Sequence, residues 1–484
     1  MRVTFAFENL GHAGSISYAA KESLLRVGIP FEICTYRDIS HRHIHGLVTY
    51  GKRLPDTAVE DVPIWIHISE SSFWSTRGTE TSSEPCFTQD DLDGTPVLFQ
   101  GVHPADVGAR EKLPDAEIAG DVIASVFYML ARCEELLGMD RDGHDRFPAS
   151  AGQGVRAGLL TRPLVDEYAL SIRRMLTSGG LFSAVEPPWG SHALCVTHDI
   201  DRIRICDSLR HLGGTVKGCL QKNPRQSPRV ALDLLKTATR RAADPLDNLD
   251  RISAVEKRSG VCSTYFFLAG GHTRFDGRYA LDAVREPIQR LREAGHEIGL
   301  HGSYGTYLSK EALLEERVAL ERVAGSPVHS IRQHYLRFRA PETWRMMGSA
   351  GLQVDSSLGF ADHEGFRAGT SFPFQAYDVV QDREIGVWEV PLIAMDATLY
   401  GYRGLSGEQS RCVLDGLLTT ISDTGGVFTV LWHNTAFYEP LYPQGSMLFD
   451  WLVRTATEGG ARACTIGEAV SLWKTHEENL TCVS

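Results

Sequence analysis

The sequence lacks a long hydrophobic run, and its ten cysteines form no closely spaced pairs. A transmembrane helix needs about eighteen to twenty consecutive apolar residues, and no such run occurs among the 484 residues. Without a Cys-x-x-Cys pair, neither a zinc ribbon nor a dense disulfide framework is expected. The first residues reach Glu8 and Asn9 without the apolar core of a secretory signal. We therefore expect reduced thiols and a cytoplasmic protein with no membrane partner.

The sequence also lacks an excess of positive charge. Its 61 Asp and Glu outnumber its 49 Lys and Arg, which gives a net charge of −12. A surface that neutralises phosphates needs clustered cations, so nucleic acid is not an expected partner. The sequence contains no Gly-x-Ser-x-Gly elbow, which argues against a serine hydrolase. It has no Gly-x-Gly-x-x-Gly phosphate loop either, and Gly11-His12-Ala13-Gly14 is interpreted as a plain turn.

The remaining composition is that of a globular protein, with 43% hydrophobic and 23% charged residues and a length sufficient for two or three domains. The first part favours an α/β unit. Helices are expected near residues 19–27 and over 121–137, where apolar residues recur at helical spacing, and residues 142–157 are expected to form a loop. Strands are expected at 3–7, 30–34, 63–68 and 96–99.

The segment Pro187-Pro188-Trp189-Gly190 interrupts the chain, and we place a domain boundary there. Residues 1–190 are expected to form a smaller α/β domain and residues 191–484 a second, larger domain. Strands alternate with helices in the second domain, which predicts a parallel (β/α) barrel. These strands are expected at 192–197, 263–268, 297–300, 330–335, 353–356, 387–394, 427–433 and 463–466.

One stretch differs from this alternation. Residues 202–258 contain thirteen Lys and Arg against six Asp and Glu, a local charge of 13 − 6 = +7. This composition predicts a basic helical insertion. A solvated helical face is favoured over a binding role, because runs of charge are usually surface.

The first barrel strand ends in two carboxylates, Asp199 and Asp201, within Thr197-His198-Asp199-Ile200-Asp201. Side chains in a strand alternate with a period of two, so both carboxylates should point to the same side. At the C-terminal mouth of a barrel strand, that side carries active sites. Two like charges so close need a shared cation or proton. Considered alone, such a pair more often caps a turn or a helix.

Three other strand ends carry ionisable or metal-binding side chains. The first is His296-Glu297-Ile298-Gly299-Leu300-His301, where the histidine spacing is one residue too long for the zinc-protease helix motif. In an extended strand only one of these histidines reaches the mouth with ease, and His301 is the better candidate. Arg332-Gln333-His334-Tyr335 closes the next strand and Leu431-Trp432-His433-Asn434 a late one. Each alone is compatible with packing, but their convergence predicts a site.

Over about residues 191–484, these motifs resemble the polysaccharide deacetylase family, also called NodB-homology or carbohydrate esterase family four. The resemblance implies a distorted (β/α) barrel and a metal-dependent hydrolase. In the family's first motif a catalytic aspartate precedes a metal-binding aspartate, which implies that Asp199 is the base and Asp201 a ligand. The second motif has two histidines four residues apart. His301 matches the first histidine, whereas Gly305 stands in the place of the second.

The family's third motif, Arg-x-Pro-Tyr, is similar to Arg332-Gln333-His334-Tyr335, with His334 in place of proline. We expect His334 to replace the missing ligand, so that Asp201, His301 and His334 hold one divalent ion, expected to be zinc. The alternative is an inactive site.

The resemblance also implies roles around these ligands. Arg332 would orient Asp199, and the backbone N–H of Tyr335 would face the developing oxyanion. The family's last motif, Leu-x-His, is similar to Leu431-Trp432-His433 and implies that His433 is the general acid. Asp396 is the first candidate for the carboxylate that holds His433, and Asp355 is the second.

Segments 121–137, 146–150 and 162–168 resemble an additional N-terminal domain of unknown role that a subgroup of this family carries. We expect removal of the acetyl group from an N-acetylated sugar, a nucleotide sugar or a related small intermediate. Two alternatives remain open: hydrolysis of another linear or cyclic amide, including deformylation, or a catalytically inactive carbohydrate-binding protein. The sequence does not predict the oligomeric state.

Overall fold

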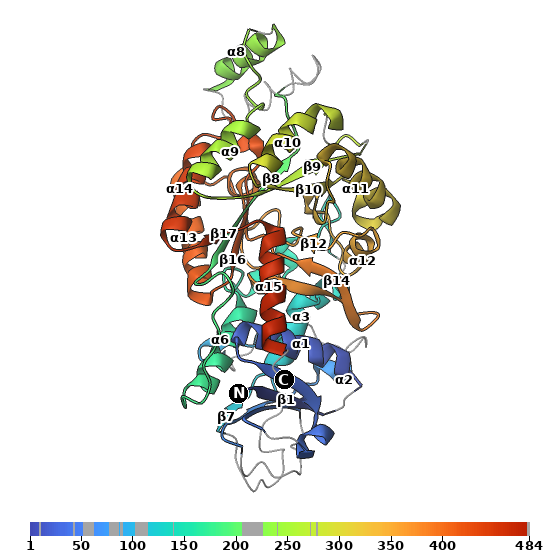
Figure 1. The fold of residues 1–484 in the computed structure, drawn as a ribbon, viewed down its shortest axis with the longest axis vertical. Helices are drawn as coiled ribbons and strands as arrows, with labels where there is room; N and C mark the ends of the chain where they lie inside the picture. Colours follow the sequence, from blue (N-terminus) through green and yellow to red (C-terminus); the bar gives the residue numbers. More distant parts are fainter. Residues whose placement is uncertain are drawn as a thin grey trace.

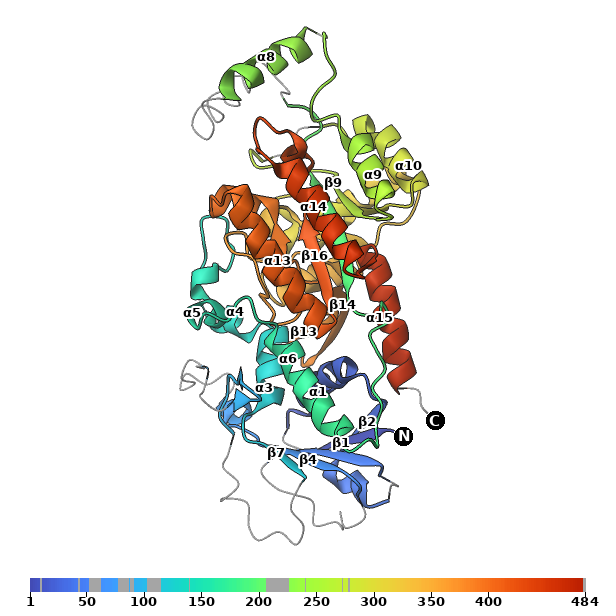
Figure 2. The same ribbon diagram turned by 90° about the vertical axis from the view of Figure 1, so that its left-hand side faces the viewer.

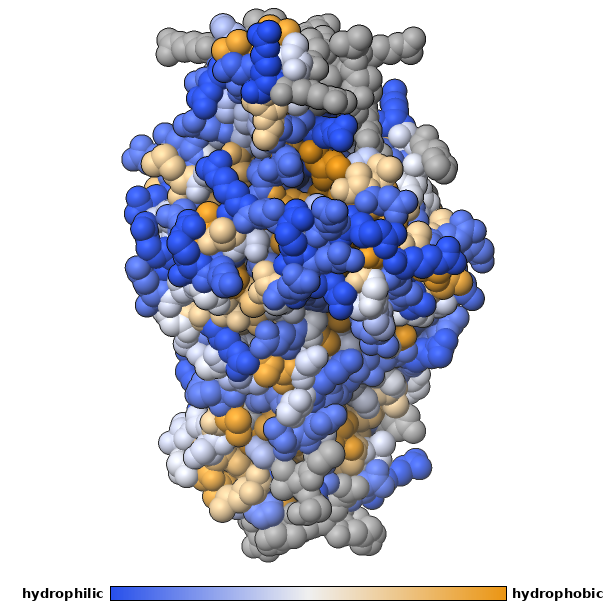
Figure 3. Space-filling model, turned by 45° about the horizontal axis from the view of Figure 1, so that its top comes forward, coloured by the Kyte–Doolittle hydropathy of each residue, from blue (hydrophilic) through white to orange (hydrophobic). Residues whose placement is uncertain are grey.

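The computed structural model describes residues 1–8, 11–41, 44–51, 62–76, 87, 91–101, 115–138, 140–205, 226–239, 241–271, 273–276 and 279–481. Two β-sheets organise these residues, a small one built from the first part of the chain and a large one built from the second (Figure 1). Among the described helices, none combines the length and apolarity that a membrane crossing requires. Apolar side chains on the face in Figure 3 form small, separate patches within a largely hydrophilic surface.

The small sheet contains five parallel strands in the order β2-β1-β3-β4-β7. The expected strands at 3–7, 30–34 and 63–68 are present, whereas β3 and β7 were not predicted. All side chains of the three central strands β1, β3 and β4 are buried, as expected for a parallel sheet, whereas the edge strands β2 and β7 are buried only in part. The bounds are β1 (Val3–Phe7), β2 (Phe31–Thr35), β3 (Gly46–Tyr50), β4 (Trp65–Ile68) and β7 (Ala116–Ile118).

Three helices form a layer between the small sheet and the large one: α1 (Ala13–Val27), α3 (Val122–Leu130) and α6 (Leu164–Thr177) (Figure 2). The short helices α2 (Phe73–Thr76) and α5 (Gln153–Arg156) also belong to this part of the chain, and α5 lies in the expected loop.

The single helix expected over 121–137 is wrong, because α4 (Cys133–Leu137) begins separately after Arg132, whose φ is 54°. The buried guanidinium of Arg132 explains the break, since it binds Glu135 and the carbonyl of Arg367 across the junction.

The strand expected at 96–99 is also wrong in extent. Only Pro96 is extended, in β6 (Thr95–Pro96), which forms a hairpin with β5 (Asp91–Leu92). The intervening Asp93 and Gly94 both have positive φ, which is typical of a tight hairpin turn.

The large sheet is a curled, mainly parallel sheet, and it confirms the expected distorted (β/α) barrel. Its order is β13-β14-β12-β11-β10-β9-β8-β16-β15, with β17 paired to β8, and only β13 and β14 are antiparallel. The bounds are β8 (Ala193–Ile200), β9 (Thr264–Leu268), β10 (Glu297–Gly302), β11 (Ser330–Gln333), β12 (Val354–Asp355), β13 (Phe374–Asp378), β14 (Arg383–Glu389), β15 (Ala394–Met395), β16 (Val427–Leu431) and β17 (Arg462–Ala463).

Helices cover the outside of this sheet (Figures 1 and 2). The C-terminal helix α15 also contacts the first part of the chain, where His476 approaches the carbonyl of Leu25 at 3.3 Å and Glu477 pairs with Lys21 at 3.3 Å. The bounds are α9 (Leu249–Arg258), α10 (Arg285–Glu293), α11 (Lys310–Ala324), α12 (Glu342–Ser349), α13 (Gly407–Thr424), α14 (Gly445–Glu458) and α15 (Ile466–Thr481).

Three sequence-based expectations for the second part need correction. The strand expected at 463–466 ends at Ala463, because helix α15 begins at Ile466. The strand expected at 387–394 is two strands, because β14 ends at Glu389 and β15 begins at Ala394, with Pro391 between them unable to donate to a ladder. The antiparallel edge strand β13 was not predicted.

The expected basic insertion at 202–258 contains α8 (Ser227–Ala238) and α9, while residues 206–225 lie outside the described residues. Helix α8 projects beyond the barrel at the top of Figure 1.

Candidate active site

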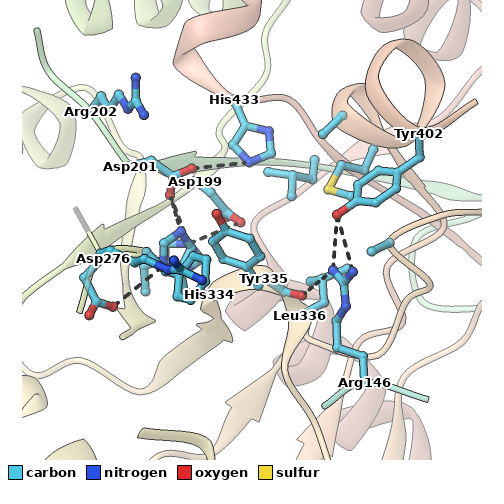
Figure 4. Close-up of a pocket in the computed structure, with 17 residues that line it drawn as sticks. Arg146, Asp199, Asp201, Arg202, Asp276, His334, Tyr335, Leu336, Tyr402 and His433 are labelled. Atoms are coloured by element: carbon cyan, nitrogen blue, oxygen red, sulfur yellow. Dashed lines mark hydrogen bonds and ion pairs between the residues drawn. The ribbon is translucent and has the colours of Figure 1, made fainter. Parts of the chain in front are cut away.

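A cavity of about 220 Å³ lies at the C-terminal ends of strands β8, β10, β11 and β16. Parallel strands bring their carboxyl ends to one edge, so the four chemically distinctive strand ends meet there. Figure 4 shows the carboxylates of Asp199 and Asp201 and the rings of His334 and His433 directed toward one another. The residues expected from the sequence that line the cavity are Asp199, Asp201, His301, His334, Tyr335 and His433.

Asp201, His301 and His334 form a group that could hold a metal ion. Their ligand atoms all lie within 4.8 Å of one another. The Oδ1 atom of Asp201 is 3.3 Å from Nε2 of His301 and 3.4 Å from Nε2 of His334. Two ligand atoms bonded to one tetrahedral zinc ion at about 2.0–2.1 Å are separated by about 3.3–3.4 Å. The two measured separations therefore fit a shared ion.

The tautomer of His301 strengthens this fit. Its Nδ1 is 2.9 Å from the carbonyl oxygen of Arg332, an acceptor, so Nδ1 carries the hydrogen. In a neutral ring, Nε2 then presents a lone pair to Asp201. Both Nε2 of His301 and Oδ1 of Asp201 are buried without a hydrogen-bond partner. Two facing electron pairs at this distance call for a cation between them, and a backbone carbonyl behind the ring is a usual support for a metal-binding histidine.

His334 contributes the second imidazole of this group, and Gly305 contributes nothing to it. Gly305 begins a short turn after β10 and does not line the cavity, whereas His334 reaches Asp201 from the end of β11. Behind His334, its Nδ1 faces Oδ1 of Asp276 at 3.9 Å, and Asp276 itself accepts a hydrogen bond from the backbone of Tyr304 at 2.7 Å. The structure therefore brings together the three residues expected to bind metal.

The histidines around Asp201 shift the pKa of its carboxyl. Burial alone would raise the pKa of its carboxyl, but the charges of His334 and of the other nearby histidines, His433 and His301, lower the pKa well below its usual range. The carboxylate form of Asp201, which a metal ion requires, is thus strongly favoured.

Asp199 lies beside this group and is held by Arg332. The buried Arg332 donates from Nη1 to Oδ1 of Asp199 at 3.2 Å and to Oγ1 of Thr197 at 2.6 Å. Its remaining donors reach the carbonyl and hydroxyl of Ser356 at 2.7 and 2.8 Å, which fixes the guanidinium plane. Oδ2 of Asp199 is 3.7 Å from Nε2 of His301. Asp199 therefore keeps one oxygen on Arg332 and turns the other toward the cavity.

His433 follows β16 and is held by Asp396, the first candidate partner. Its Nδ1 is 2.7 Å from Oδ1 of Asp396, and its backbone N–H donates to Oδ2 at 3.2 Å. Burial alone would lower the pKa of His433, but the charge and hydrogen bond of Asp396 raise it to about 10. The second candidate, Asp355, is wrong as this partner, because it accepts hydrogen bonds from the backbone and hydroxyl of Ser357 instead.

The turn after β11 is strained. Tyr335 has φ 64° and ψ 11°, and Leu336 has φ 53°, so two consecutive residues with side chains occupy the left-handed region. Each such residue costs on the order of 1–3 kcal/mol and persists only where the surroundings hold it. The carbonyl of Tyr335 accepts a hydrogen bond from Nη1 of Arg146 at 3.0 Å (Figure 4).

Several cavity residues were not identified from the sequence as site residues. They include Arg146, Arg202, Arg274, Phe275, Asp276 and Tyr402. In the sequence, Arg146 lies between α4 and the short turn at Ala149–Ala151 and precedes every barrel strand. Reasoning from strand ends could not find it. The only available signal was its place in an Arg-Phe-Pro segment of an otherwise Gly- and Asp-rich loop.

Residues 14–180 match a family of unknown function, DUF7033. No curated protein matches the chain. Similar solved structures include a protein from Mycobacterium smegmatis assigned as a polysaccharide deacetylase (18% identity, TM-score 0.42), PuuE allantoinase (14%, 0.41) and the peptidoglycan deacetylase PdaC from Bacillus subtilis (13%, 0.30). Each match covers 60% of this chain, and 95%, 95% and 94% of the respective solved chains. Polysaccharide deacetylases, which the sequence motifs resemble, are thus among the similar structures.

Proposed function

We propose that this chain is a metal-dependent amide hydrolase that removes the acetyl group from an N-acetylated sugar or a related small molecule. The observation that carries the proposal is the group formed by Asp201, His301 and His334, in which buried atoms without hydrogen-bond partners face one another. A base and an acid, Asp199 and His433, flank this group on the same cavity. Similarity to polysaccharide deacetylases agrees with this class of reaction.

Asp201, His301 and His334 would hold a divalent ion, with zinc favoured by two imidazoles, one carboxylate and the spacing of the ligand atoms. Such an ion supplies Lewis-acid chemistry, because it polarises an amide carbonyl and lowers the pKa of water. Three protein ligands leave a position for water or substrate, as catalytic zinc sites require.

Asp199 acts as the general base. Its free oxygen faces the cavity, where it accepts the proton of the attacking water, while the bond from Arg332 keeps the carboxylate oriented. The new C–O bond forms as the carbonyl π bond opens to an oxyanion. The backbone N–H of Tyr335 donates a hydrogen bond to this oxyanion.

His433 acts as the general acid. With Nδ1 held by Asp396, its Nε2–H points to the cavity and lies 3.8 Å from Oδ2 of Asp201. It donates the proton to the amide nitrogen as the C–N bond breaks, so that acetate and a free amine leave. The raised pKa of about 10 keeps His433 protonated at neutral pH, as an acid must be.

The cavity favours a small substrate with an anionic group. Phe275 and Tyr335 provide apolar surface, and the exposed guanidinium groups of Arg202 and Arg274 line the same cavity. Guanidinium groups pair well with carboxylates and phosphates. A nucleotide sugar or another soluble anionic intermediate fits this lining, and dispersed cysteines support a cytoplasmic setting for it.

The test is a substrate panel combined with metal analysis. Purified protein should contain about one equivalent of zinc by elemental analysis and should release acetate from N-acetylated sugars or nucleotide sugars, detected by mass spectrometry. Asp199→Asn is the matched inactive control. Ring opening of a cyclic amide without acetate release would favour the alternative amide hydrolase. Absence of a stoichiometric ion together with no turnover would reject the hydrolase and leave a carbohydrate-binding protein.

A further inference from the structure

Part of the cavity wall comes from outside the barrel. The docking loop, residues 140–147, belongs to the region that precedes the barrel, and its Arg146 lines the cavity. We propose that Arg146 is a positioning residue of the active site, which holds the Tyr335–Leu336 turn in the conformation that catalysis needs. The inference rests on the proposed function, because it concerns the oxyanion contact assigned to Tyr335.

The docking loop is anchored to the barrel beside the cavity. Arg337 donates from Nε to the carbonyl of His144 at 2.8 Å, and Nδ1 of His144 is 3.0 Å from the hydroxyl of Tyr304. Asp145 pairs with Arg339 at 3.0 Å. These partners follow β10 and β11, so the docking loop holds together the two barrel loops that follow the strands of His301 and His334.

The hydrogen bonds of Arg146 define its role. A guanidinium has five N–H groups, and that of Arg146 makes four hydrogen bonds and one ion pair to other residues of the protein. Nε donates to Oδ2 of Asp142 at 2.8 Å, and Nη2 forms an ion pair with the same oxygen at 2.7 Å. The carbonyl of Tyr335 receives Nη1 at 3.0 Å, and the hydroxyl of Tyr402 lies 3.4 Å from both Nη1 and Nη2. All of these partners are residues of the protein, so Arg146 acts through the residues that it holds.

Asp142 in turn fixes Arg146. Its Oδ1 accepts the backbone N–H groups of His144 at 2.8 Å and Arg146 at 3.0 Å, which closes the loop around the guanidinium. Arg146 thereby links the turn after β11 to Tyr402, which ends the helical turn Ala397–Tyr402 next to Asp396 (Figure 4). One side chain from the first part of the chain therefore braces both the oxyanion side and the acid side of the cavity.

Holding the Tyr335 carbonyl fixes the direction of the Tyr335 N–H, because both groups belong to one residue with a defined left-handed φ and ψ. Without Arg146, the turn is free to relax toward the more favourable right-handed region. A displacement of about 1 Å at a reacting geometry costs about a hundredfold in rate. We therefore expect Arg146→Ala to lower kcat about a hundredfold with KM changed less than about threefold, because no substrate contact is lost.

The experiment compares Arg146→Ala and Arg146→Lys with Arg141→Ala. Arg141 is a matched control, because its hydrogen bonds and ring contact that the structure describes stay within residues 135–147. Bound metal and melting temperature are measured for each variant. Lysine should restore only part of kcat, because an ammonium group cannot bridge Tyr335, Tyr402 and Asp142 together. Millimolar guanidinium should raise kcat of Arg146→Ala and leave Arg141→Ala unchanged.

A readout independent of turnover separates this inference from the proposed function. Hydrogen–deuterium exchange followed by mass spectrometry should show faster exchange in the peptide spanning residues 330–340 of Arg146→Ala, and wild-type exchange in Arg141→Ala. If the wild-type protein hydrolysed no amide, the proposed function would fail, while the exchange result would still decide whether Arg146 holds the turn. Unchanged exchange, or a raised KM with unchanged kcat, would overturn the positioning role.

Discussion

Two clusters of histidines and carboxylates lie on opposite faces of strand β8. They differ in how many of their buried polar atoms have a hydrogen-bond partner. The front cluster, at the cavity, consists of Asp199, Asp201, His301, His334 and His433. The rear cluster, between the sheet and α9, consists of His198, Glu256, Ser263, Tyr265 and His296. Alternation along the strand turns His198 to the rear and Asp199 to the front.

In the rear cluster the protein itself satisfies the polar atoms. His198 reaches the carbonyl of Trp432 at 2.6 Å and Oε1 of Glu256 at 2.8 Å. Glu256 also accepts from Ser263 and, at 2.6 Å, from Tyr265. In the front cluster, by contrast, Oδ1 of Asp201 and Nε2 of His301 have no hydrogen-bond partner.

Residue types alone therefore do not distinguish a structural cluster from a reactive one. Buried polar atoms left without partners are costly, so a protein keeps them where a ligand completes their bonding. Variants of the rear cluster therefore serve as controls for variants of the front cluster, and the reverse.

The largest effect should follow from replacing the base. Asp199→Asn keeps the shape of the side chain and an oxygen that can accept from Arg332, but it removes the proton acceptor. We expect kcat to fall about a hundredfold to ten-thousandfold, with metal content and melting temperature unchanged. Steady-state kinetics on a substrate from the panel measures this. Near-normal turnover would show that Asp199 is not the base.

Replacing a ligand should remove the metal. In His334→Ala the group loses one of its three ligands, and we expect metal affinity to fall by more than about a hundredfold, as in His301→Ala. His296→Ala, in the rear cluster, is the control and should retain about one equivalent of metal. Elemental analysis after dialysis distinguishes the outcomes. Full occupancy in His334→Ala would return His334 to a packing role.

These two predictions concern residues that could be identified from the sequence. A physical property of parallel sheets explains why. Parallel strands place their carboxyl ends at one edge, so chemistry at strand ends can be located without knowing the sheet's full path. Asp199, Asp201, His301, His334 and His433 do meet at one cavity. Their roles as base, ligands and acid stay predictions until the measurements above are made.

Other parts of the fold and site could not be predicted because they depend on contacts between distant segments. Arg146 reaches the cavity through a loop whose partner, the Tyr335 carbonyl, is 189 residues away. The break at Arg132 depends on the carbonyl of Arg367, 235 residues away. No local periodicity records such pairs, and β13 was missed for a similar reason, since its strand is defined by its pairing with β14.

A smaller effect, on stability alone, should follow from opening the rear cluster. Glu256→Gln leaves His198 without its buried counter-charge, and we expect a loss of about 3 kcal/mol in the free energy of unfolding. Metal content and kcat should stay at wild-type values. Asp250→Asn is the matched control on the same helix, because Asp250 forms a surface ion pair with Arg290 worth less than about 1 kcal/mol. Loss of metal in Glu256→Gln would mean that the two clusters are not separate.

The smallest effect concerns pH. Burial alone would raise the pKa of Glu256, but His198 and hydrogen bonds from Ser263 and Tyr265 lower it overall. A carboxyl whose pKa is lower in the folded state stabilises the fold above its unfolded pKa, about 4.3, and loses this contribution as pH falls through the folded pKa. Burial lowers the pKa of His296, whereas Glu256, 3.8 Å away, raises it, so the substitution also changes how His296 titrates at higher pH. The stability difference between wild type and Glu256→Gln, measured by urea unfolding below the pH range in which histidines titrate, should therefore shrink as the pH falls below about 4.3. A difference that did not shrink below about 4.3 would mean that Glu256 is already protonated in the folded protein, and the rear cluster would then hold a neutral carboxyl instead of an ion pair.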